Sequence, residues 1–102
     1  MDRLDEIAER LRRLRLAYGF QQARPWCQFV GIGETSWNAF ERGHRRITLD
    51  EALKLCAKTG ASLDWIFRGL EYMLPLHVAE KLAAVPDEEL KLMDRRFSKR
   101  AS

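Results

Sequence analysis

Residues 27–43 read CQFVGIGETSWNAFERG, and this stretch decides the fold. The small residue Cys27 is followed four positions later by Gly31, and the apolar residues Trp37 and Phe40 then recur at helical spacing. This pattern is typical of two short helices packed around a tight turn, a helix-turn-helix. The second helix of such a unit stands out from its domain, where it can enter the major groove of DNA.

The residues around the turn place the two helices. We expect the first helix over residues 24–30, because Pro25 is tolerated in the first turn of a helix, where no intrahelical N–H is missed. Gly31 permits the left-handed backbone that a tight turn needs, and Ile32 packs beneath it. The second helix is expected from Glu34 to Arg42. The buried side of the first helix is predicted to consist of Trp26, Cys27, Phe29 and Val30.

An amphipathic helix is predicted over residues 3–18, ending at Gly19. Its apolar face combines spacings of three and four: Leu4, Ile7, Leu11, Leu14 and Tyr18. The same helix carries the basic residues Arg10, Arg12, Arg13 and Arg15, which we expect to form a solvated face. A phosphate contact from Arg10 or Arg13 is the alternative.

Two more helices are predicted before residue 70. Thr48 and Glu51 form a capping box, in which the threonine hydroxyl accepts from the Glu51 N–H and the Glu51 side chain reaches back. The helix that follows should end at Gly60 and bury Leu49, Ala52, Leu53 and Cys56. A shorter helix begins at Ser62 and Asp64, ends at Gly69, and carries Leu63, Ile66 and Phe67. Five helices over residues 1–70 predict a compact all-α domain.

Residues 71–102 form a separate helical extension in this interpretation. Leu74 and Pro75 open one helix, with Leu76, Ala79, Leu82 and Ala83 on one side, and a second helix begins at Pro86. We expect this extension to pack on the domain or to form a dimer or partner surface. The residues predicted for that surface are Leu76, Leu82, Leu90, Met93 and Phe97.

The charge of the chain is modest, but its distribution is uneven. The 102 residues carry a net charge of +3, and the excess lies within residues 1–46, which hold nine Arg and six acidic residues. Residues 47–85 hold four basic and five acidic residues. Arg accounts for 13 of the 18 basic residues, which suits bidentate contacts to phosphate or guanine. The basic excess thus coincides with the half that contains the predicted helix-turn-helix.

Several functional classes find no support in the sequence. Cys27 and Cys56 occupy apolar helix positions, as expected of reduced thiols that pack as small hydrophobes, and no spacing indicates a disulfide, a metal site or a cofactor. His44 and His77 lack a nucleophile or carboxylate partner in sequence, so an enzyme is not expected. No apolar run is long enough to span a bilayer or to act as a signal peptide, which favours a cytoplasmic protein.

The outward face of the second helix carries groups that can read bases. With Trp37 and Phe40 directed into the core, the helical period places Glu34, Thr35, Asn38 and either Glu41 or Arg42 outside. Asn pairs with adenine, Thr touches the thymine methyl, and Glu accepts from the cytosine amino group. Glu34 is therefore either a base reader or a residue that stabilises the start of the helix.

Residues 4–69 resemble the lambda-repressor-like (XRE/Cro) DNA-binding domain. The resemblance is carried by Gly31-Ile32, by residues 37–43 (WNAFERG), by Arg46-Ile47 and Leu53, and by residues 61–69 (ASLDWIFRG). It implies a five-helix bundle whose members usually regulate transcription as dimers on operators with two half-sites.

Carried over position by position, the resemblance assigns base reading to Glu34, Thr35 and Asn38 and a DNA contact to the loop residue Arg45. The family usually has Gln where this chain has Glu34, and its phosphate-clamping Gln corresponds to Ala23, so Gln22 or Arg24 takes that role. The predicted DNA-binding set is Gln22, Arg24, Glu34, Thr35, Asn38, Arg42, His44, Arg45 and Arg46.

The sequence therefore predicts a sequence-specific DNA-binding regulator, with repression as the expected mode, that binds double-stranded DNA as a homodimer. The alternative is an antitoxin-like or regulatory protein-interaction module whose C-terminal helices bind another protein. The two hypotheses differ in the role that they give to the extension after residue 70.

Overall fold

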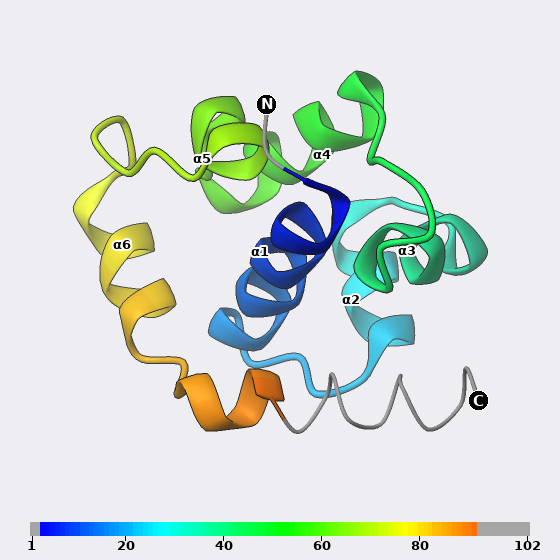
Figure 1. The fold of residues 1–102 in the computed structure, drawn as a ribbon, viewed down its shortest axis with the longest axis horizontal. Helices are drawn as coiled ribbons and strands as arrows, with labels where there is room; N and C mark the ends of the chain where they lie inside the picture. Colours follow the sequence, from blue (N-terminus) through cyan, green and yellow to red (C-terminus); the bar gives the residue numbers. More distant parts are fainter. Residues whose placement is uncertain (1–2, 92–102) are drawn as a thin grey trace.

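Helix α1 (Leu4–Ala17) lies at the centre of the fold, in a computed structural model that describes residues 3–91 (Figure 1). Helices α2 (Ala23–Val30) and α3 (Glu34–Glu41) lie on one side of α1, and α6 (Leu76–Ala83) lies on the other. Helices α4 (Leu49–Thr59) and α5 (Leu63–Arg68) cover one end, and residues 87–91 are helical again. The described residues contain helices and no strand, which confirms the all-α fold class.

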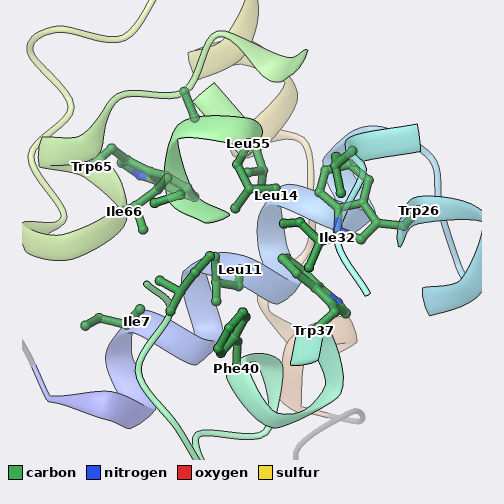
Figure 2. Packing of buried hydrophobic residues seen from close by; sticks show 14 of the residues in the cluster. Ile7, Leu11, Leu14, Trp26, Ile32, Trp37, Phe40, Leu55, Trp65 and Ile66 are labelled. Atoms are coloured by element: carbon green, nitrogen blue, oxygen red, sulfur yellow. The ribbon is translucent and has the colours of Figure 1, made fainter. Parts of the chain in front are cut away.

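The core forms where α1, α2 and α3 meet α4 and α5. Trp26 of α2 and Trp37 of α3 are fully buried, with their ring centroids 5.7 Å apart in an edge-on arrangement. Figure 2 shows Trp37 and Phe40 directed from α3 toward the buried face of α1, which presents Ile7, Leu11 and Leu14. The predicted inward direction of Trp37 and Phe40 is thus confirmed.

The turn between α2 and α3 depends on Gly31. This residue has φ +78°, and the N–H groups of Gly31 and Ile32 both donate to the Cys27 carbonyl, at 2.8 and 3.1 Å. Ile32 then turns back into the core, where it is 4% exposed. Gly33 has φ −61° and ψ 139° and forms the N-cap of α3. The sequence pattern therefore predicted this turn correctly.

A single substitution tests the backbone requirement at this turn. Changing Gly31 to Ser should lower the free energy of unfolding by about 1 kcal/mol, since an L-residue is strained at positive φ and no atom lies within 4 Å of the added Cβ. The matched change of Gly33 to Ser should be neutral or slightly stabilising, because Ser is a favourable N-cap in extended backbone. Urea unfolding followed by circular dichroism measures both, and equal losses would contradict the argument.

The buried face of α4 differs from the predicted one. Leu49 and Leu53 are 56% and 47% exposed, Cys56 is half-buried, and the buried residues are Ala52, Leu55 and Thr59. Two apolar stripes overlap on this helix and share Ala52, and the contacts of α4 with α2 and α5 select the stripe that contains Leu55. The N-cap was predicted correctly, because the Thr48 hydroxyl accepts from the Glu51 N–H at 3.2 Å.

The sequence led us to expect that the arginines of α1 form a solvated face, and this prediction is wrong. Arg12 and Arg15 are 5% and 2% exposed. Arg12 donates to the Glu41 carbonyl at the end of α3, and Arg10 donates to the Ile66 carbonyl in α5. Arg13 donates to the Leu82 carbonyl near the end of α6 and to the Val85 carbonyl just after it. The last carbonyls of a helix lack intrahelical donors, and these guanidinium groups supply them. A phosphate contact from Arg10 or Arg13 stays a prediction, and both guanidinium groups already donate to carbonyls of the protein.

The segment after residue 70 packs on α1. Val78 and Leu82 of α6 belong to the main core, and Leu90 is 2% exposed in a smaller cluster with Leu16 and Val85. Arg13 also pairs with Asp87 at 2.6 Å, which lowers the pKa of that carboxyl. Leu82 and Leu90 are thus core residues, and their assignment to an intermolecular surface is wrong.

The other residues assigned to that surface have different outcomes. Leu76 is 74% exposed, whereas Met93 and Phe97 lie outside the described residues. Ala79 is half-buried and Ala83 exposed, so α6 turns a different face to the core than the predicted one. Within residues 3–91, no helix has the length and apolar character needed to cross a lipid bilayer.

Candidate nucleic-acid interface

A buried ion pair fixes the orientation of α3. Glu41 and Arg15 are 2% exposed, with an Nη2–Oε1 distance of 2.7 Å and an Nε–Oε1 distance of 2.8 Å. The Trp37 indole Nε1 donates to the other carboxylate oxygen at 3.0 Å. Glu41 is therefore an anchor, and the option that it faces outward to DNA is wrong. The buried Arg15 guanidinium, which the pattern had placed in solvent, draws the carboxylate inward.

The Arg15–Glu41 ion pair links α1, α3 and the connection between α1 and α2. Arg15 also donates to the Phe20 carbonyl in the α1–α2 connection at 2.8 Å, and Arg12 holds the Glu41 carbonyl at 2.7 Å. The C-terminal half of α3 is thereby tied to α1 through charged hydrogen bonds, which are shorter and stronger than neutral ones. The opposite face of α3 is left toward solvent, with Glu34 and Thr35 exposed and Asn38 half-buried.

Glu34 pairs with Arg24 across the two helices. The Arg24 Nε donates to Glu34 Oε2 at 3.3 Å, and the two side chains are 76% and 44% exposed. Glu34 is the first residue of α3, where the helix dipole favours a negative charge, and the N-cap position belongs to Gly33. Arg24 lies in the first turn of α2, next to the exposed N-cap residue Gln22. The structure thus brings together two residues that the sequence had predicted to contact DNA independently of each other.

The basic loop follows the other end of α3. His44, Arg45 and Arg46 are exposed, and the loop is closed by the buried Ile47. The Arg45 guanidinium lies over the Phe40 ring, 5.1 Å from its centroid, which holds this side chain beside the C-terminal end of α3. Arg42 is half-buried at the C-cap, so it is less available to a partner than the three loop residues.

Two residues near the turn were not singled out from the sequence. Gln28 is exposed and lines a shallow, open depression with Arg24 and Glu34. Its position four residues after Arg24 was the available signal, because such residues share one helix face. Lys54 of α4 donates to the Gly31 carbonyl at 3.2 Å, a contact that only the packing of α4 against the turn creates.

The cysteines carry no sign of chemistry. Burial raises the pKa of the Cys27 thiol to about 11. The charges of Glu34 and Glu41 add to this increase, and the charge of Arg15 opposes it. Burial also raises the pKa of Cys56. Both thiols are free, and protonated thiols are poor nucleophiles. The described residues hold no cluster of three or more His, Cys, Asp or Glu suited to a metal ion.

The candidate interface therefore consists of the outward face of α3 with a basic or polar group at each end. Arg24 and Gln22 lie at the start of α2 beside Glu34, and the loop with Arg45 and Arg46 follows the last turn of α3. A scan of protein-family models and searches of curated proteins and solved structures find no match to this chain.

Proposed function

We propose that the protein is a sequence-specific DNA-binding regulator that inserts α3 into the major groove. The proposal rests on one observation, the contrast between the buried face of α3 and its exposed polar face. Trp37, Phe40 and Glu41 lock one face into the core, while Glu34 and Thr35 stand exposed on the other. A rigidly held helix with polar residues outward and basic groups at both ends suits a groove lined by phosphates.

The roles of the side chains follow from their chemistry. Thr35 and Asn38 suit the thymine methyl and the adenine edge, respectively. Gln22, His44, Arg45 and Arg46 suit phosphate oxygens, which fix the register of the helix without reading sequence. Half-buried Arg42 lies at the edge of this set. We further propose that two copies bind two half-sites and that binding represses transcription.

Selection from randomised duplex DNA, followed by sequencing, tests the proposal directly. We expect an enriched motif made of two related half-sites, and fluorescence anisotropy should show tighter binding to it than to shuffled DNA. A reporter placed behind the motif should lose expression when the protein is present. Absence of any enrichment at low salt would reject the function.

Two substitutions separate the positioning contacts from the reading contacts. Changing Arg45 to Ala should weaken binding to all sequences and reduce the slope of log K against log salt by about 1, as expected for one lost phosphate contact. Changing Asn38 to Ala should cost about 1–3 kcal/mol on the selected site and relax the base preference at one position. Titrations on selected and shuffled duplexes measure both. Equal losses on the two duplexes for the Asn38 variant would contradict its reading role.

A second candidate function is supported by exposed apolar residues in the α5–α6 connection and at the start of α6. Tyr72, Met73 and Leu76 are 71%, 63% and 74% exposed. Such a group is typical of protein contacts, so an antitoxin-like or regulatory interaction module is the alternative. Sedimentation of the full chain and of a variant with Met73 and Leu76 changed to Ser tests it. This candidate function is rejected if the two proteins sediment identically and the full chain binds no other protein in the absence of DNA.

A further inference from the structure

We propose that Arg24 and Glu34 act together as one unit that reads a single C·G base pair in the major groove. This inference rests on the proposed DNA binding by α3. It assigns the two residues a joint role in specificity, in place of one phosphate contact and one independent base contact.

The geometry joins the two side chains before any partner is present. Arg24 Nε and Glu34 Oε2 are 3.3 Å apart, although the residues are ten positions apart and belong to different helices. The pair lies at the rim of the shallow depression between α2 and the start of α3. The Arg24 side chain is 76% exposed and the Glu34 side chain 44%, so a nucleic acid that meets α3 meets the pair.

The pair presents an acceptor and a donor side by side. Arg24 uses its Nε–H toward Glu34, and its terminal nitrogens carry the other four N–H donors of the guanidinium group. A carboxylate has about four lone-pair positions, so Glu34 can accept from Arg24 and from a second donor at once. The combined surface therefore offers a bidentate donor next to an acceptor.

Among the base pairs, C·G fits this surface best. Its major-groove edge places the cytosine N4 amino donor next to the guanine O6 and N7 acceptors. Glu34 accepts from the amino group, and the terminal nitrogens of Arg24 donate to O6 and N7. An A·T pair offers the adenine N7 without the neighbouring O6, so the bidentate contact of Arg24 is lost. A carboxylate near phosphates is otherwise costly, and the paired guanidinium offsets its charge.

The ion pair itself contributes little to folding. Exposed pairs of this kind stabilise a fold only slightly, because water screens them and ordering two long side chains costs entropy. Substitutions at Arg24 and Glu34 should therefore leave the thermal unfolding transition nearly unchanged. This property makes the pair suitable for a clean functional test.

The test is a set of binding selections with the full chain on randomised duplex DNA. Four proteins are compared: the wild type, Arg24→Ala, Glu34→Ala and the double variant. The wild-type motif should contain one C·G position whose preference falls roughly 10- to 100-fold in each single variant. The double variant should lose no more than the singles at that position, because the two residues act jointly. Arg24→Lys should keep its overall affinity for duplex DNA yet lose the C·G preference, since Lys retains the positive charge but lacks the planar fork.

The control is Arg68→Ala, which breaks another exposed pair, Arg68 with Asp64 at 3.7 Å on α5. It should leave the motif unchanged. The inference is overturned if the motif of either single variant keeps the C·G preference, if the wild-type motif holds no such C·G position, or if the variants weaken binding uniformly without a change at any position. A wild-type protein that enriches no motif at all would reject the proposed function itself, which separates the two failures.

Discussion

Replacing Glu41 with Ala is expected to lower the free energy of unfolding by about 3–5 kcal/mol. The substitution leaves the Arg15 guanidinium, 2% exposed, without its carboxylate in a part of the core that water does not reach. It also removes the acceptor of the Trp37 indole. A buried charge that loses its counter-charge is far more costly than the loss of the attraction alone, so the whole domain should be affected.

Urea unfolding followed by circular dichroism measures this loss, and two further variants define its cause. The double variant with Arg15 changed to Met and Glu41 to Leu should be more stable than either single charge removal, because no unpaired charge remains. Arg68→Ala, which breaks an exposed pair, should cost less than about 1 kcal/mol. If Glu41→Ala costs no more than this surface control, the ion pair does not anchor α3.

Changing Leu55 to Ala should cost about 2–5 kcal/mol, whereas changing Leu53 to Ala should cost less than about 1 kcal/mol. The two leucines are two residues apart on α4, and the same atoms are removed in each case. Leu55 is 0% exposed and belongs to the main core, so its truncation removes buried surface and leaves a cavity. Leu53 is 47% exposed, and solvent already covers much of its side chain.

Chemical denaturation at fixed protein concentration measures both variants under identical conditions. The comparison controls for helix propensity, because Leu→Ala has nearly the same intrinsic effect at either site. Similar losses for the two variants would indicate that α4 buries its Leu49–Leu53 stripe in solution. Such a result would also argue for an intermolecular contact that covers the exposed leucines.

The predicted interface depends on the interior of the protein as much as on its surface. Arg12 and Arg15 each bond to Glu41, the last residue of α3, so α1 sets the direction in which α3 presents Glu34 and Thr35. A substitution that breaks these bonds to Glu41 is expected to weaken DNA binding and to lower the free energy of unfolding. Variants of Arg24, Asn38 or Arg45 should instead lose binding while they remain folded.

Local patterns in the sequence were enough for much of the fold. The helices around the turn, the left-handed Gly31, the N-cap at Thr48 and the inward direction of Trp37 and Phe40 all follow from neighbouring residues. These features depend on dihedral preference, on short-range hydrogen bonds and on helical period, which a few adjacent side chains specify. The exposed positions of Glu34 and Thr35 are a consequence of the same period.

The tertiary structure decided the features for which two local patterns were equally good or for which charge opposed burial. The sequence pattern favoured the Leu53 face of α4, which is wrong, since the choice between the Leu53 and Leu55 faces depends on where α2 and α5 lie. Charge marked Arg15 and Glu41 as surface residues, and only the meeting of α1 with α3 makes their burial favourable. The Arg24–Glu34 pair likewise exists because the turn brings two helix starts together. Contacts between distant residues have no counterpart in local spacing, so they became visible only in the folded chain.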